Sequence, residues 1–329
     1  MKMIAKIMFL LAFSSMVGCR PQEKASTPAH QQPTTQQPAK KSPQTKKHPK
    51  NSTNPSAHVQ TLWNNDKNQE LSAFMQQWQT KMAQSYLGTY DGKKPSYRDN
   101  VFPDVLINGQ LQDKVNWGAL PIALQWSPKG DKQGEYQVVA VASENTTLAE
   151  TYFFTIHNGH PLVFEASKDK GDLIYLYDSQ NVELQQGFAK ILTGKIPVSH
   201  SDNELNQDAA AQIAQQQIPS AYRHTWYWQD QTTHNIENFD LTNAQDLRLD
   251  YYTTTTPQWL NVRTAQQTAG VGNDIYLRYR YFDGQQVPVA MMASGAGIWF
   301  DNNAYLQRRQ AQIMDTYTFG DEPKGRDDE

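Results

Sequence analysis

TYFFTIHNGHPLVFEA, residues 151–166, carries the clearest structural signal in the chain. Residues rich in β-branched and aromatic side chains precede and follow Asn158-Gly159, as in two paired strands. Asn-Gly suits the positive φ angles of a two-residue type I′ turn. The stretch therefore predicts a β-hairpin with strands at 151–157 and 160–166.

Neighbouring segments extend this hairpin into a larger α+β unit. YQVVAVAS (136–143) predicts a further strand, and LIYLY (173–177) predicts a strand or a connector. NVELQQGFAKILTG (181–194) has the periodicity of an amphipathic helix, and Gly194 is a typical residue to close it.

A longer helix is expected before these strands. Asn64, Asn65 and Asp66 are residues that cap helix N-termini. The apolar face at the 3–4 spacing consists of Leu71, Phe74, Met75, Trp78, Met82 and Tyr86. Gly88 is expected to end the helix. Residues 93–135 predict only short strands, because prolines interrupt them.

The second half repeats this order of elements. Residues 201–204, SDNE, form a capping-box pattern that opens a helix to about Gln217. A second hairpin is expected around Asp283-Gly284. The strands, including the two of this hairpin, are predicted at LRLDYY (247–252), QWLNVRT (258–264), DIYLRYRYF (274–282) and QQVPVAMMA (285–293). Residues 302–313 predict a closing helix.

The predicted fold is therefore α+β, with two similar units. Each has a helix, an antiparallel sheet with an Asx-Gly hairpin, and a closing helix. No residue-level identity distinguishes an ancient duplication from the same solution used twice. The expected segments are a lipoprotein signal peptide (1–18), a Pro/Gln/Lys-rich linker (19–57), and α+β domains at 58–198 and 199–329.

The N-terminus, MKMIAKIMFLLAFSSMVGC, reads as a lipoprotein signal. Lys2 and Lys6 precede a short apolar core, which is too short for a mature membrane span. Gly18-Cys19 is similar to the cleavage and lipidation site of bacterial lipoproteins, with Met16 where leucine is usual. Cys19 is the single cysteine, so it cannot form an internal disulfide. The alternative is an ordinary secretory signal with an incidental cysteine.

Charge and composition separate the linker from the remainder. The net charge is +2 on the signal and +6 on residues 20–57. Since the whole chain has a net charge of −3, residues 58–329 have a net charge of −11. An acidic body is not expected to bind nucleic acid. The basic linker is either attracted to an anionic membrane or cell-wall polymer, or serves solubility and extension alone. Eight Trp, sixteen Tyr and twelve Phe predict a folded, aromatic-rich body.

The chain resembles the domain of unknown function 4767 family over residues 61–195. The resemblance is carried by LWNNDKNQELSAFMQQWQTKMAQSYLGTY (62–90), by YQVVAVAS and TYFFTIHNGHPLVF, and by GFAKILTG. These are lipoproteins of Gram-positive bacteria, notably of the lactic-acid type. The resemblance implies a lipid anchor and surface exposure, at the extracellular face of the cell membrane. It implies no catalytic residues.

No sequence motif names a reaction or a cofactor. There is no G-x-S-x-G, S-x-x-K or H-E-x-x-H motif, no P-loop, and no glycine-rich dinucleotide turn. His157 and His160 face each other across the first hairpin. Two ligands bind metal poorly, so two solvated imidazoles are the preferred interpretation. Asp240, Asp246 and Asp250 either come together to form an acidic site or are separate, solvated side chains.

The best candidates for ligand binding are aromatic. Exposed rings would suit the flat faces of cell-wall sugars, and core packing is the competing interpretation. The candidates are Tyr222, Trp226, Tyr227, Trp228 and Trp259, with Tyr251 and Tyr252 nearby.

Three functions remain open. The first is a non-catalytic binding or interaction module that meets a cell-wall polymer or another surface protein. The second is an envelope hydrolase acting on cell-wall glycan or peptide, which needs a pocket with paired carboxylates or a Ser–His pair. The third is a helper lipoprotein that binds exported peptides at an apolar groove or strand edge.

Overall fold

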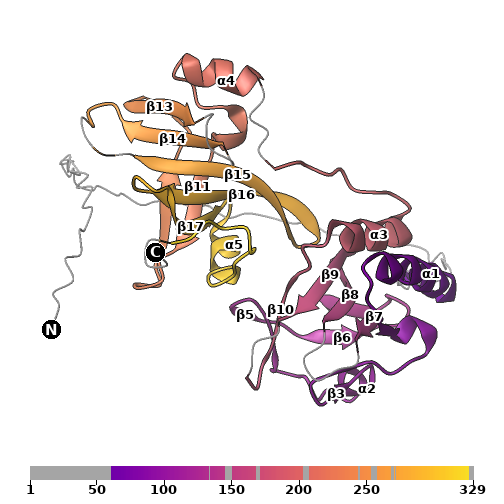
Figure 1. Ribbon diagram of the computed structural model, residues 1–329. Helices are drawn as coiled ribbons and strands as arrows, with labels where there is room; N and C mark the ends of the chain where they lie inside the picture. The colour runs from indigo at the N-terminus through magenta and orange to yellow at the C-terminus, as the bar shows by residue number, and fades with distance from the viewer. Residues whose placement is uncertain are drawn as a thin grey trace, which may run out of the picture. The chain divides into compact units, whose positions relative to one another are not determined.

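The computed structural model describes residues 61–132, 134–144, 150–167, 171–202, 207–243, 245–252, 258–267, 270 and 272–325 (Figure 1). The expected signal peptide, Cys19 and the linker lie outside these residues. Residues Ser56–Glu329 group into one compact unit. The division of this unit into two domains at residues 198 and 199 stays a prediction.

The first sheet has eight strands in the described part of the chain, and it is mixed. Its order is β1-β7-β8-β9-β10-β4-β5, and β6 pairs with β7. The strands are β1 (Leu87–Gly88), β4 (Val115–Trp117), β5 (Leu120–Pro121), β6 (Leu124–Trp126), β7 (Tyr136–Ser143), β8 (Thr151–His157), β9 (His160–Ala166) and β10 (Ile174–Asp178). A separate two-stranded ladder joins β2 (Ser96–Tyr97) and β3 (Asn100–Val101).

The expectation of an antiparallel sheet in this half is wrong for two pairs. β4 runs parallel to β10, and β6 runs parallel to β7. Both short strands come from the segment 93–135, whose sequence has no clear alternation, so their direction is set by tertiary packing. The β8–β9 hairpin is confirmed with the predicted bounds. Asn158 and Gly159 have φ angles of 49° and 82°, as a type I′ turn requires.

Helix α1 (Asn65–Lys81) begins as expected and ends early. The side chain of Asn64 accepts a hydrogen bond from the Lys67 N–H at 2.9 Å, which caps the helix. The helix stops at Lys81 rather than at Gly88, because Ala83 adopts a φ of 54°. Tyr86 still reaches the core, from the segment that follows the helix.

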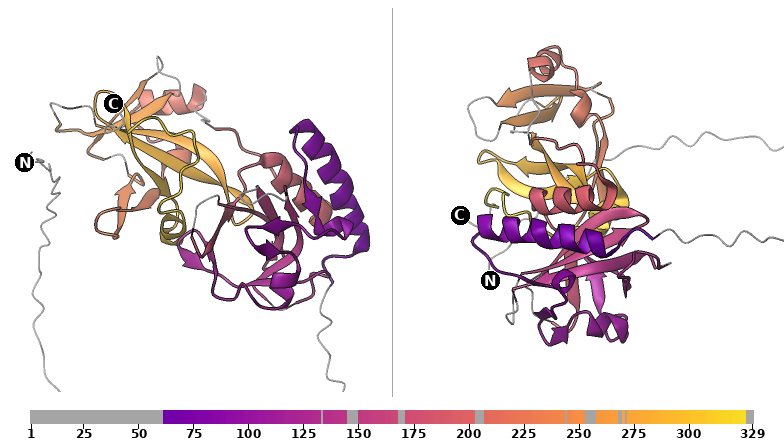
Figure 2. Two further views of the ribbon diagram at one scale, coloured as in Figure 1. Left: turned by 60° about the horizontal axis from the view of Figure 1, so that its bottom comes forward. Right: turned by 90° about the vertical axis from the view of Figure 1, so that its right-hand side faces the viewer.

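Helix α3 (Val182–Thr193) closes at Gly194 as predicted, with a left-handed φ of 76°. Figure 2 shows α1 and α3 side by side on one face of the first sheet. Gln185 fixes α3 to the sheet, because its amide accepts from the Val163 N–H and donates to the Val163 carbonyl. The short helix α2 (Asp104–Ile107) and the 3₁₀ turn η1 (Thr89–Asp91) complete this half.

The second sheet is an antiparallel, curled half-barrel with the order β12-β11-β17-β16-β15-β14-β13. Its strands are β11 (Thr225–Gln229), β12 (Ile236–Asp240), β13 (Leu247–Tyr252), β14 (Trp259–Thr264), β15 (Asn273–Phe282), β16 (Gln285–Ser294) and β17 (Trp299–Tyr305). The Asp283-Gly284 hairpin is confirmed, with φ angles of 54° and 69°. Similarity between the two halves stays a prediction.

The expected closing helix at 302–313 is wrong over its first part. Residues Trp299–Tyr305 form β17, because they pair with β16 and, at Tyr305, with β11. Only α5 (Arg308–Ile313) is helical. Helix α4 (Gln207–Ala214) and the 3₁₀ turn η2 (Ser220–Tyr222) precede the sheet. No described helix is both long enough and apolar enough to cross a bilayer.

One hydrophobic cluster belongs to both sheets. Trp117 and Phe164 of the first sheet share it with Phe282, Val289 and Tyr305 of the second. The rings of Trp117 and Phe282 stack with centroids 4.8 Å apart. The opposite face of each sheet has a core of its own. The two halves are therefore joined through buried apolar side chains.

Candidate functional site

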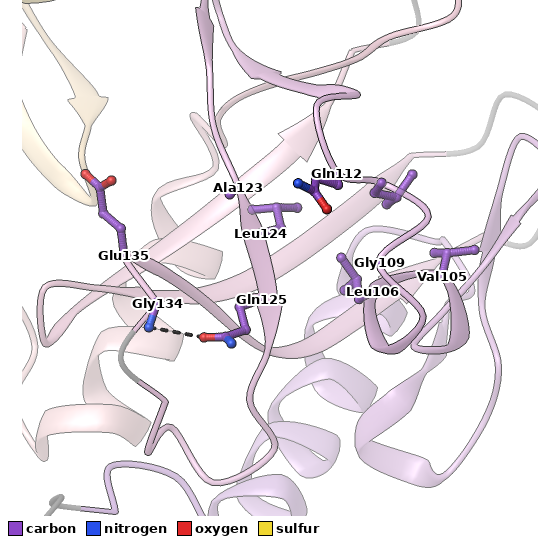
Figure 3. A pocket seen from close by; sticks show the side chains of 10 residues that line it. Val105, Leu106, Gly109, Gln112, Ala123, Leu124, Gln125, Gly134 and Glu135 are labelled. Atoms are coloured by element: carbon purple, nitrogen blue, oxygen red, sulfur yellow. Dashed lines mark hydrogen bonds between the residues drawn. The ribbon is translucent and has the colours of Figure 1, made fainter.

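Two open hollows flank the short strand β6. The first has a volume of about 520 Å³ and the second about 510 Å³. Figure 3 shows the first: Leu124 and Gln125 stand between Gly134 and Glu135 on one side and α2 with its following loop on the other. The second lies toward Trp126, and it is lined also by Ile107, Pro128, Lys129, Asp131 and Lys132. We call the pair the β6 hollows.

Leu106 and Gln125 line both β6 hollows, so they form the ridge between them. The Gln125 Oε1 accepts a hydrogen bond from the Gly134 N–H at 3.1 Å, drawn in Figure 3. Among the described residues, β6 pairs only with β7, so it is an edge strand of the sheet. An edge strand presents unpaired backbone groups to a partner chain.

Glu135 connects the first hollow to a buried histidine. His157 is 4% exposed, and its Nε2 lies 3.3 Å from the Glu135 Oε1. Its Nδ1 lies 2.5 Å from Asp283 Oδ1, at the turn of the second hairpin. Tyr136 stacks on the imidazole with centroids 4.3 Å apart. The preferred expectation of a solvated His157 is therefore wrong, whereas His160 is exposed.

The turn of the second hairpin docks on the first sheet beside His157. The Gly284 N–H donates to Asp178 Oδ2 at 2.8 Å. Gln180 accepts from the Tyr281 N–H at 2.8 Å and donates to the Tyr281 carbonyl at 3.0 Å. We call these contacts, with the His157–Asp283 pair, the hairpin junction.

Two groups of the hairpin junction have raised pKa values. Burial raises the pKa of Asp178 to about 7, against the opposing effect of the Gly284 N–H. Burial alone would lower the pKa of His157, but the hydrogen bond and charge of Asp283 outweigh it, and the pKa is raised. A group whose pKa is higher in the folded state stabilises that state most when it is protonated. Both groups therefore favour the junction at lower pH.

We predict that the protein becomes less stable to urea as the pH rises from 5 to 8. The stability contributed by Asp178 is lost between its ordinary pKa of 3.8 and its folded value of about 7. The part of this loss that falls between pH 5 and pH 8 is about 2–3 kcal/mol. Asp178→Asn keeps an oxygen for the Gly284 N–H and removes the titration. The free energy of unfolding of the variant, measured by urea denaturation at each pH, should change less with pH than that of the wild type. The same dependence on pH in both proteins would contradict the assignment.

Residues 60–192 match the profile of a protein family described as "Domain of unknown function (DUF4767)". The chain contains a DUF4767 domain. The match confirms the family resemblance expected over residues 61–195. No curated protein and no solved structure matches the chain. The β6 hollows and His157 lie within the DUF4767 domain, whereas Asp283 comes from the C-terminal half.

The aromatic candidates lie outside the DUF4767 domain and do not form one surface. Tyr222, Trp226 and Trp259 are buried in the second sheet's cores, which was the competing interpretation. Tyr227 and Trp228 are half-buried and face opposite sides of β11, since Tyr227 packs on the shared cluster and Trp228 on the second sheet's own. Ligand binding by this set stays a prediction.

The remaining candidates have separate surroundings. Asp240 accepts from the Thr242 N–H at 3.0 Å, and Asp250 pairs with Arg263. Asp240 and Asp250 lie on β12 and β13, the two edge strands of the second sheet, so they do not build one site. Within the described residues, no three His, Cys, Asp or Glu side chains are placed to hold a metal ion.

Sequence reasoning missed the β6 hollows and Asp178. The residues around β6 lie in the segment 93–135, where no periodic pattern marks a site. Asp178 directly follows the apolar run LIYLY, and a carboxylate at the end of a buried strand was the one available signal. Its partner Gly284 lies 106 positions away, so no local pattern could pair them.

Proposed function

We propose that the protein is a non-catalytic binding module, displayed at the outer face of the membrane by a lipid on Cys19, and that it takes an extended peptide along β6. The proposal rests on the two β6 hollows, which lie on either side of the ridge of Leu106 and Gln125 at the edge strand β6. This arrangement supports the peptide-binding hypothesis over the hydrolase. The basic linker and the Gram-positive lipoprotein resemblance support the surface location.

An extended peptide fits this arrangement for a geometric reason. Alternate side chains of a strand point the same way and lie about 7 Å apart. A peptide crossing the ridge at Leu106 can thus place one side chain in each hollow. Backbone bonds to an edge strand would give affinity, and the two hollows would give specificity. The apolar lining of Val105, Leu111 and Leu124 favours apolar side chains in the first hollow.

We predict that Ile107→Lys weakens peptide binding about tenfold. Ile107 lines the second hollow and is 60% exposed, so the change adds a charge to the site without opening the core. Tenfold corresponds to about 1.4 kcal/mol. Peptides selected from a random display library against the wild-type protein would be titrated into both proteins, with fluorescence anisotropy as the readout.

Val198→Lys is the matched control. Val198 is also an exposed apolar residue, at 77%, and it lies after α3, outside the residues that line the β6 hollows. Its peptide affinity should stay at the wild-type value. An equal loss of peptide affinity in both variants, or no loss in Ile107→Lys, would show that β6 is not the peptide-binding site. Selective retention on purified cell-wall glycan instead of peptides would favour the polymer-binding alternative.

We predict that Cys19→Ser releases the protein from the membrane fraction. A diacylglyceryl group and a further acyl chain each bury methylenes worth about 0.8 kcal/mol, so their loss removes the anchor. Cell fractionation with mass spectrometry of the mature N-terminus measures this. A wild-type protein with an unacylated terminus, secreted into the medium, would exclude the lipid anchor and leave the peptide site untouched.

A further inference from the structure

A third, smaller cavity lies on the C-terminal half, away from the DUF4767 domain. It has a volume of about 230 Å³ and lies between β11, β17, α5 and the segment 314–318. Tyr227 of β11 lies opposite Tyr305 of β17 in the ladder, so strand alternation puts Gln229, Asn303 and Tyr305 on the same face. We call it the β17 cavity.

Tyr305 is the residue that indicates ligand binding. It lines the β17 cavity and is 3% exposed. Its hydroxyl is buried and has no hydrogen-bond partner among the described residues. Buried polar groups are normally paired, and an unpaired one costs the folded state its lost hydration. The Tyr305 side chain lines the cavity, but its hydroxyl lies behind that wall with almost no accessible area, so a small turn of the side chain on binding would bring the hydroxyl to a molecule that enters.

The other lining groups define the chemistry of that molecule. Gln229 and Gln231 are amides and Asp301 and Asp315 are carboxylates, while Phe300 and Tyr317 add half-buried rings. None of the described lining residues is Lys, Arg or His, so an anion would find no cationic partner. Amide and carboxylate oxygens accept hydrogen bonds from hydroxyls, and an aromatic ring packs against the C–H face of a sugar.

We infer that the β17 cavity is a binding site for one neutral, polyhydroxylated ring of the sugar class. Pockets that hold drug-sized ligands have volumes of about 300–1,000 Å³, so a cavity of about 230 Å³ suits a single ring rather than an oligomer. This inference is independent of the peptide proposal for β6, because the two sites share no lining residue.

The cavity wall is held in place before any ligand arrives. Glu322 accepts from the Phe319 N–H at 3.0 Å and from the Gly320 N–H at 2.8 Å, which fixes the chain just after the wall segment. Tyr317 packs on Tyr177 of the first sheet, with ring centroids 4.4 Å apart. A wall that is already ordered loses little freedom on binding.

The test is a titration of the full chain in detergent with N-acetylglucosamine and with methyl glucoside, followed by NMR. Saturable binding is expected for at least one sugar, and Tyr305→Phe should weaken it about three- to tenfold, the effect of one hydrogen bond. The substitution removes an unpaired hydroxyl, so a purely structural role predicts an unchanged or higher melting temperature and unchanged sugar affinity. Gln229→Ala is a second variant if Tyr305→Phe does not fold.

Tyr222→Phe is the matched control, because Tyr222 is equally buried but lies in the core on the other face of the second sheet. It should bind sugar as the wild type does. Absence of saturable binding to both sugars would overturn the inference. So would tighter binding of inorganic phosphate or of L-lysine than of either sugar, and so would equal losses in the Tyr222 and Tyr305 variants.

Discussion

Gly284→Ala is expected to lower the free energy of unfolding by about 3–6 kcal/mol. A Cβ at this position would lie 2.0 Å from the Pro161 carbonyl oxygen, and that oxygen belongs to β9 and cannot move alone. Overpacking costs about 1–3 kcal/mol, and the positive φ adds about 1–2 kcal/mol. Displacing the turn also removes the N–H that serves Asp178, which leaves a buried carboxylate with one partner fewer.

Gly159→Ala provides the control within the same chain. Gly159 occupies the same position of the other Asx-Gly turn, with a φ of 82°, and its Cβ would meet nothing within 4 Å. It should cost only the conformational term of about 1–2 kcal/mol. Urea denaturation of both variants measures the difference, which isolates the docking of the turn on β9. Equal destabilisation would mean that the hairpin junction contributes nothing to stability.

Arg278→Met is expected to cost about 3–5 kcal/mol, the usual effect of removing one partner of a buried ion pair. The Arg278 side chain is fully buried, and its Nη2 lies 2.9 Å from the Glu322 Oε1. Asn303 and Asp321 also accept from this guanidinium. Met replaces the aliphatic part of the side chain but not the guanidinium, so it leaves the Glu322 carboxylate, itself 7% exposed, without its charge partner.

Arg280→Met separates this effect from surface electrostatics. Arg280 also pairs with Asp321 and with Asp202, but those carboxylates are each about two-fifths exposed, so the pair is worth about 1 kcal/mol or less. Thermal unfolding at pH 7 would compare the two variants. Adding Glu322→Gln to Arg278→Met should restore part of the loss. Equal effects of both arginines, or no recovery in the double variant, would contradict a buried ion pair.

The parts of the fold that sequence predicts are those with local causes. The two Asx-Gly hairpins and the α3 cap each depend on residues adjacent in the chain, and their predicted bounds agree with the structure within a residue. β17 and the parallel pairs of β4 and β6 depend on partners far away in sequence, so the local pattern alone favoured the wrong element at residues 302–305.

The candidate sites were harder to predict than the fold, because they depend even more on residues that are distant in the sequence. His157 was noticed beside its turn, but its buried state depends on Asp283, which lies 126 positions away. The aromatic run at 222–228 suggested a binding surface, whereas burial in the second core accounts for Tyr222 and Trp226. Hollows arise where several elements fail to fill space, and such a gap leaves no pattern in the sequence of any one of them.

The shared hydrophobic cluster has a consequence for the boundary of the DUF4767 domain. The family match ends at residue 192, yet Trp117 and Phe164 are buried partly against Phe282 and Tyr305, well beyond that point. An excised fragment of residues 60–192 would turn that aromatic face toward water and should aggregate or pair with itself. Any chain in which this domain occurs alone must therefore cover the same face with a different extension or with a second subunit.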